Sequence, residues 1–144
     1  MKLNDSELRQ AMALLENYKA RMDALSRQVQ ILRVSLQEVN LALDTLKVFK
    51  DAQEGEEIAV PIGATSYINV KVSSNKNVIV DVGSGISLEK TPEQSIEYME
   101  ANNAEISEAL KKTVESLTEI QNVASQLSSA IQQEYQARQQ PEVQ

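Results

Sequence analysis

The sequence contains no cysteine, no histidine and no tryptophan, and these absences exclude several classes of site. Without cysteine and histidine the chain has no disulfide, no thiol nucleophile, no Cys/His zinc centre and no histidine general base. Aromatic residues make up only 3% of the chain, which is low for a globular core and common in coiled coils. We therefore expect no enzymatic activity, no metal site and no cofactor.

Long apolar runs and a positive charge balance are also missing. No run approaches the roughly 20 apolar residues that a membrane span requires, and the first ten residues, MKLNDSELRQ, lack the apolar segment of a signal peptide. The net charge of −7 disfavours nucleic acid and anionic membranes as partners. These features predict a cytoplasmic protein that binds neither nucleic acid nor membrane.

The middle of the chain, from Ile58 to Lys90, is the one stretch in which apolar and polar residues alternate. A period of two places the apolar residues on one face of a β-strand. Turn-forming residues at 63–65, 73–76 and 83–85 separate four such runs, which predicts two tandem β-hairpins. The apolar face comprises Ile58, Val60, Ile62, Ile68, Val70, Val72, Val78, Val80, Val82, Ile86 and Leu88.

Two isolated hairpins cannot form a closed core, because four short strands bury little apolar area and leave free edges. Other chains can complete such strands into a barrel. We therefore interpret the hairpins as an assembly module, and their apolar face as the surface that joins subunits.

Both flanking segments show the 3-4 spacing of a coiled coil. Before the hairpins the spacing runs without interruption from Leu8 to Leu46, and after them it runs from Ile96 to Glu134 with a few polar positions. Thr91 and Gln94 have the spacing of a helix capping box before this second segment.

The two apolar seams match when the chain folds back on itself. If Leu46 is opposite Ile96, every later pair has residue numbers that add up to 142, such as Leu25 with Leu117. This register predicts an intramolecular antiparallel coiled coil. Asn103 then lies in the seam, where it either fixes the register or is a tolerated polar layer.

The predicted fold class is therefore α+β, a long antiparallel two-helix coiled coil joined by two tandem β-hairpins that complete an oligomeric β-barrel. We assign residues 1–50 to the first coiled-coil helix and 51–90 to the hairpin assembly module. Residues 91–138 form the second helix, and 139–144 form a disordered tail.

Two glycine- and acid-containing motifs carry no chemistry in our interpretation. Residues 83–85, Gly-Ser-Gly, lack the remaining residues of a phosphate-binding loop and lead into a strand, so they are better explained as a hairpin turn. Asp81 and Glu89 lack a third metal ligand, and an aspartate beside a glycine turn usually stabilises that turn.

The seam of the coiled coil does not by itself explain two further groups of apolar residues. Ile31, Val34, Leu41 and Val48 form a second stripe on the first helix, which indicates contact with a neighbouring subunit, a lined cavity, or chance. The antiparallel pairing also brings apolar residues from the two outer helix ends to one place, as either an adaptable sticky surface or a simple closure of the coil. The candidate client-binding residues there are Leu8, Met12, Leu14, Leu15, Leu127, Ile131 and Tyr135.

The hairpin region resembles the α-class subunit of prefoldin. The resemblance covers residues 56–102 and rests on VPIG at 60–63, NVIVDVGSGISLEKT at 77–91 and IEYM at 96–99, together with the presence of two hairpins. The helices match that family in length and heptad character only. This resemblance identifies the chain as an archaeal-type α-class subunit.

The resemblance implies a hexamer of two α and four β subunits, in which the hairpins build a double β-barrel body that carries six coiled coils. It further implies an ATP-independent holdase that captures unfolded proteins at the coiled-coil ends and delivers them to a group II chaperonin. The alternative from a different class is a structural adaptor subunit whose coiled coil docks a defined helical partner.

Overall fold

A computed structural model describes residues 2–74 and 76–140 of the chain. Two helices, α1 (Asp5–Asp51) and α2 (Pro92–Gln139), flank four strands. These are β1 (Glu57–Gly63), β2 (Ser66–Lys71), β3 (Val78–Asp81) and β4 (Ser87–Lys90). The predicted fold class of two long helices joined by two tandem hairpins is confirmed.

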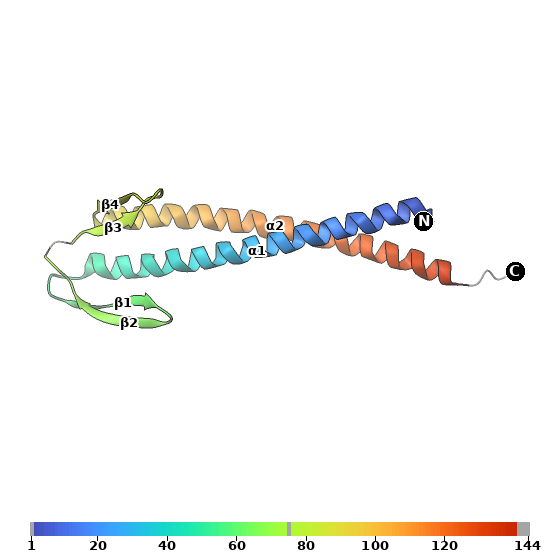
Figure 1. The fold of residues 1–144 in the computed structure, drawn as a ribbon. Helices are drawn as coiled ribbons and strands as arrows, with labels where there is room; N and C mark the ends of the chain where they lie inside the picture. The colour runs from blue at the N-terminus through green and yellow to red at the C-terminus, as the bar shows by residue number, and fades with distance from the viewer. Residues whose placement is uncertain (1, 75, 141–144) are drawn as a thin grey trace. The chain divides into compact units, whose positions relative to one another are not determined.

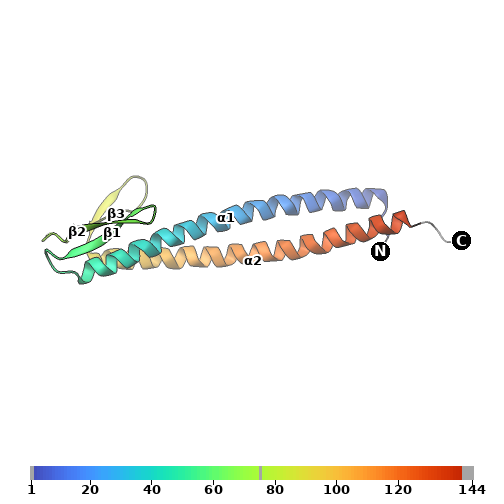
Figure 2. The ribbon, with the colours of Figure 1, turned by 90° about the horizontal axis from the view of Figure 1, so that it is seen from below.

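The chain divides into two compact units. The terminal unit holds residues 1–31 and 109–144, and the hairpin unit holds residues 32–108. Each helix contributes one part to each unit, and in each unit the two helices run antiparallel beside one another (Figures 1 and 2). The tail predicted for residues 139–144 lies mostly outside the described residues, and Gln139 is the last residue of α2.

Both helices begin with a reciprocal capping box. At α2 the Thr91 N–H donates to Gln94 Oε1 at 3.1 Å, and the Gln94 N–H donates to Thr91 Oγ1 at 3.2 Å. At α1, Asn4 and Glu7 exchange the same pair of bonds at 2.9 and 2.8 Å. Because the first N–H groups of a helix have no partner within the helix, these bonds fix where each helix starts.

The seam of the terminal unit follows the predicted register. Val29 and Thr113, whose numbers add up to 142, are both buried, at 5% and 8% exposure. Leu8 and Glu134 form another such pair and are also buried, at 6% and 7%. Buried residues at matching positions of both helices are what a shared antiparallel seam requires.

In the hairpin unit, Asn103 donates a hydrogen bond of 2.6 Å from its side-chain nitrogen to Asn40 Oδ1 on the other helix. The predicted register places Asn103 opposite Val39, which is the residue directly before Asn40. The polar position in the seam is thus satisfied across the helix pair, which favours its register-fixing role over a merely tolerated polar layer.

The register can be tested by crosslinking in the terminal unit. Cysteines that replace Leu25 and Leu117 should form a disulfide within one chain, because they face each other across the seam. Cysteines at Leu25 and Ile131 should not, since two heptads separate them by about 21 Å along the axis. Mass spectrometry after oxidation reads out both pairs. The opposite crosslinking pattern would overturn the register.

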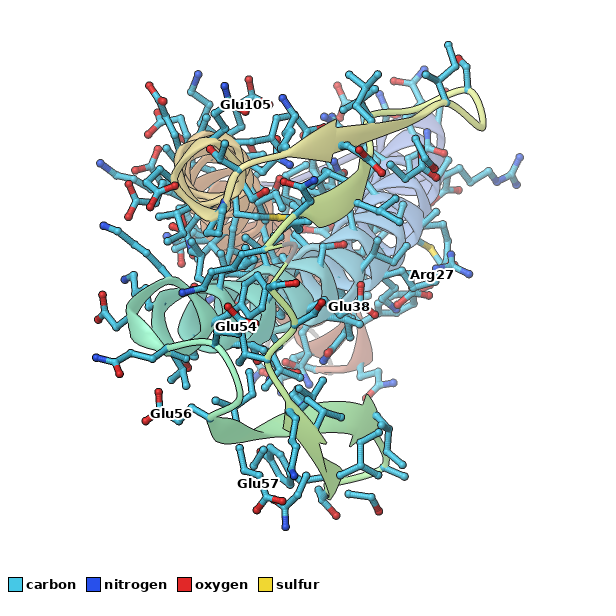
Figure 3. The ribbon with its side chains drawn as sticks, turned by 90° about the vertical axis from the view of Figure 1, so that its left-hand side faces the viewer. Arg27, Glu38, Glu54, Glu56, Glu57 and Glu105 are labelled. Carbon is cyan, nitrogen blue, oxygen red and sulfur yellow. The ribbon has the colours of Figure 1, made fainter. Side chains whose placement is uncertain are left out.

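Each hairpin is a separate two-stranded antiparallel sheet. In the first, Ile58 is paired with Val70 and Val60 with Ile68; in the second, Val80 is paired with Leu88. Directly paired residues share one face of a sheet, so the predicted apolar faces exist in both hairpins. Within the hairpin unit, the first hairpin lies beside the end of α1 and the second beside the start of α2 (Figures 1 and 3).

The glycine-containing turns close the hairpins as expected. The second turn has Gly83 and Gly85 at positive φ, and the Gly83 N–H donates to Asp81 Oδ1 at 2.9 Å. Asp81 therefore stabilises the turn through its side chain. Among the described residues, no group of three or more acidic side chains is arranged to hold a metal ion.

Candidate functional site

We call the end of the terminal unit where α1 begins and α2 ends the tip. Figures 1 and 2 both show these helix ends together. The seven predicted client-binding residues differ in exposure there. Met12, Leu14 and Tyr135 are 42%, 43% and 42% exposed. Leu15 and Leu127 are half-buried, whereas Leu8 and Ile131 are buried in the seam. Of the seven, only Met12, Leu14 and Tyr135 are therefore exposed.

The structure brings Met12 and Tyr135 together. The Tyr135 hydroxyl donates to Met12 Sδ at 3.4 Å, which joins α1 to α2 at the surface of the tip. A thioether and a phenol ring form a polarizable apolar surface that adapts to different partners. Leu14 follows Met12 by two residues on the same helix and therefore points in a different direction.

A charged cluster at the tip was not predicted from the sequence. Arg138 on α2 donates to Asp5 Oδ1 at 2.6 Å, to Glu134 Oε1 at 3.1 Å and to the Leu3 carbonyl oxygen at 2.7 Å. We call these three contacts the Arg138 clasp. Glu134 was identified only as a polar position in the seam, and its spacing of four residues from Arg138 is the one signal in the sequence.

Arg138, the cation of the clasp, stays charged near neutral pH. Hydrogen bonds to Asp5, and then to Glu134, raise the pKa of Arg138 above its ordinary value. A cation with a raised pKa contributes stability at every pH below the pKa it has in the unfolded chain, and loses it only as the pH rises through the folded pKa. Salt, which screens exposed charges, is therefore the condition that should weaken the clasp.

A hollow of about 480 Å³ lies at the tip beside the clasp. Its lining is mainly apolar and comes from both helices and from the segment that precedes α1. The residues that line it are Lys2, Leu3, Glu7, Ala11, Leu127, Ala130, Gln133, Glu134 and Ala137.

The eleven predicted assembly residues fall into three groups. Ile58, Val72 and Val80 are buried within the chain itself, at 9%, 5% and 3% exposure. Val60, Val70, Val78 and Val82 are half-buried. Ile62, Ile68, Ile86 and Leu88 are exposed, at 61%, 47%, 55% and 45%. Burial of the first group needs no second subunit.

Only part of the apolar face of the first hairpin is covered by the rest of the chain. Ile58 and Val72 form a small core with Ala52, and Phe49 packs against it from the last turns of α1. Ile62 and Ile68, nearer the hairpin turn, remain exposed. On the opposite face, Glu57 points away from the helix pair (Figure 3). The apolar face is thus half covered by the chain's own helix and half open.

Lys76, between the two hairpins, holds the end of α1. Its ammonium donates to the carbonyl oxygen of Lys50 at 2.8 Å and also to that of Ala52. The same nitrogen lies 5.5 Å from the centre of the Phe49 ring. A cation at the last carbonyls of a helix is favourable because these groups lack partners and carry the negative end of the helix dipole. Sequence reasoning assigned this lysine to a turn only.

A second hollow, also of about 480 Å³, lies within the hairpin unit between the end of α1, the first hairpin and the start of β3. Its lining is mostly apolar and includes Leu46, Phe49, Val60, Val70 and Val78. It continues the partly open face of the first hairpin, because Val60 and Val70 belong to both.

The second stripe on α1 is exposed in the single chain. Ile31 is 66% exposed, in the terminal unit, and Val34, Leu41 and Val48 are 52%, 41% and 54% exposed, in the hairpin unit. The pairing with α2 therefore leaves this stripe open, as its offset from the seam predicts. No helix of the described residues has the length and apolarity to cross a membrane.

The family model for "Prefoldin subunit" matches residues 18–137. The chain belongs to the prefoldin family. Prefoldin subunits are chaperone components and not enzymes, which agrees with the absence of a predicted catalytic group. The match extends over both helices and both hairpins, so it covers far more of the chain than the hairpin motifs on which the resemblance was based.

Curated relatives support the α class of prefoldin. Prefoldin subunit alpha of Methanothrix thermoacetophila is 32% identical over 108 residues, which is 75% of this chain and 71% of that protein. The α subunit of Pyrococcus horikoshii is 30% identical over 92% of this chain and 90% of its own. That of Archaeoglobus fulgidus is 30% identical over 96% and 98%. The predicted resemblance to the α class is confirmed.

Two solved structures share the fold. A cryo-EM structure of filamentous PFD from Methanocaldococcus jannaschii has a TM-score of 0.61 at 24% identity, covering 85% of this chain and 98% of that one. The crystal structure of the prefoldin beta subunit from Thermococcus strain KS-1 has a TM-score of 0.63 at 13% identity, covering 98% and 100%. At these identities the likeness concerns the fold alone.

Proposed function

We propose that this prefoldin subunit is part of an ATP-independent holdase that captures unfolded proteins at its tips and delivers them to a group II chaperonin. The observation that carries the proposal is the exposed Met12–Tyr135 contact, which places adaptable apolar side chains from both helices at the tip. Apolar segments of a non-native chain are the partners that such a surface suits. We place the complex in the cytoplasm.

We further propose that the subunit assembles through its hairpins with β-class subunits, as two α and four β chains around a β-barrel body. The exposed half of the hairpin face supports this, because Ile62, Ile68, Ile86 and Leu88 are open in the single chain. The hairpins also retain free strand edges, which pairing with neighbouring strands would satisfy.

Each tip contact is weak on its own, because Met12 and Tyr135 together offer little apolar area. Several tips on one body would act on the same unfolded chain, and multivalency of this kind raises avidity by about 10²–10⁴-fold. Assembly and capture are thus linked in the proposal: without the body, the tips bind singly.

A structural adaptor is the second candidate. The exposed stripe of Val34, Leu41 and Val48 favours it, since an apolar stripe with a spacing of seven residues is what a partner helix recognises. An adaptor would bind one folded helical partner and ignore unrelated unfolded chains.

An aggregation assay separates the two functions. The subunit, assembled with a prefoldin β subunit and verified by native mass spectrometry, is mixed with a chemically denatured protein that is diluted from denaturant. We expect suppression of light scattering without added nucleotide, for at least two unrelated denatured proteins. Unchanged scattering for both, together with tight binding of one folded helical protein, would favour the adaptor.

A further inference from the structure

The short segment before α1, residues 2–4, is not helical and is attached to the tip by the Arg138 clasp. The Leu3 carbonyl oxygen accepts a hydrogen bond of 2.7 Å from Arg138, and Asp5, the first helical residue, accepts one of 2.6 Å. The Asn4–Glu7 capping box fixes the direction in which the segment enters the helix. The segment is therefore held at two points, the Leu3 carbonyl and the start of α1.

Leu3 also borders the tip hollow. Its side chain is half-buried and lines the hollow together with Ala11 of α1 and Leu127 of α2. The segment thus presents two features to the tip, an aliphatic side chain and a main-chain carbonyl. Any extended apolar peptide carries the same two features, whatever its sequence.

We propose that the tip hollow and Arg138 form a subsite for an extended apolar peptide segment, and that residues 2–4 act as a self-ligand which the client displaces. The proposal rests on the proposed client capture at the tips and specifies how the capture is regulated. In it, a client places one aliphatic side chain in the hollow, and its carbonyl takes the position of the Leu3 carbonyl at Arg138.

The energetics allow such displacement. The side chain of Asp5 is 80% exposed and that of Arg138 is 36% exposed, so the ion pair is solvated and contributes little. When a self-ligand occupies a site most of the time, the apparent affinity for a competitor is the intrinsic affinity multiplied by the fraction of chains whose site is free. An effect of a few-fold is therefore expected, and it should shrink as salt weakens the clasp.

Two variants test the self-ligand. Leu3→Ser removes the aliphatic side chain, and Asp5→Asn removes the charge of the exposed ion pair but leaves Arg138 in place for a client. We expect each to bind an unfolded probe about two- to fivefold more tightly than the wild type; for Asp5→Asn this is the scale of an exposed ion pair. Asp23→Asn, which removes an exposed acid elsewhere on the same helix in the terminal unit, should bind like the wild type.

The probe is fluorescently labelled, reduced and carboxymethylated lactalbumin, which cannot refold, and binding to the assembled complex is measured by fluorescence anisotropy. Raising salt from about 50 to about 300 mM should tighten binding by the wild type and leave Asp5→Asn, which lacks the exposed ion pair, unchanged. Equal binding by Leu3→Ser and wild type would show that the segment does not compete, and weaker binding would make Leu3 part of the grip; both overturn the self-ligand. A complex that binds the probe equally well without its tips would instead overturn the proposed function.

Discussion

Ile68→Asp in the first hairpin should abolish co-assembly with β-class subunits, whereas Tyr67→Asp, one residue earlier, should leave it intact. Both side chains are exposed in the single chain, at 47% and 60%, so neither substitution buries a charge within the subunit. They lie on opposite faces of β2, because successive strand residues alternate. An apolar barrel interior would bury Ile68, and an unpaired charge there costs several kcal/mol.

Co-expression with a β subunit followed by native mass spectrometry measures this outcome. Val80→Asp serves as the comparison, since Val80 is only 3% exposed within the chain and its substitution should unfold the hairpin even without a partner. Circular dichroism of the separate subunits distinguishes the two effects. Assembly of the Ile68 variant at wild-type levels would contradict the barrel proposal.

Removal of the first fourteen and last twenty residues should leave the body assembled and sharply reduce protection of a denatured client. The deletion takes away Met12, Leu8, Ile131 and Tyr135, but most layers of the seam remain between Leu15 and Leu46. Removing one end alone should cause a smaller loss, because the remaining helix end still offers part of the apolar surface.

Light scattering of a denatured client at low and high salt measures this loss, with native mass spectrometry as the control for assembly. Protection by the wild type should persist in high salt, because an apolar grip is only weakly screened. Full protection by the truncated complex would show that the client binds elsewhere, with the stripe of Val34, Leu41 and Val48 as the next candidate site. Protection that disappears in high salt would indicate that the client is bound mainly by electrostatic interactions.

The tip combines two kinds of contact that respond differently to conditions. Met12 and Tyr135 form an apolar surface that salt hardly affects, whereas the Arg138 clasp contains the exposed Arg138–Asp5 ion pair, which salt weakens. Under our proposals the apolar surface binds the client, and the clasp lowers the affinity by holding residues 2–4 at the tip. The salt dependence of client binding therefore measures how strongly residues 2–4 compete with the client.

Local patterns in the sequence were enough to predict the helices, the hairpins and the pairing of the two helices. Heptad spacing predicted both helices and an antiparallel register, and the burial of Val29 with Thr113 agrees with it. Alternation predicted two hairpins, and the spacing of Thr91 and Gln94 predicted a capping box that the structure contains. These features depend on local propensity and on a period, which neighbouring residues of one chain encode fully.

Which apolar residues of the hairpins remain exposed depends on how the hairpins pack against the helices. A strand period puts Ile58 and Ile68 on the same face, yet only the first is covered, because Ala52 and the last turns of α1 reach just the base of the hairpin. The Lys76 contacts at the end of α1 and the Arg138 clasp join residues far apart in the sequence. No period encodes such contacts, since they depend on where a turn or a helix end comes to lie in space.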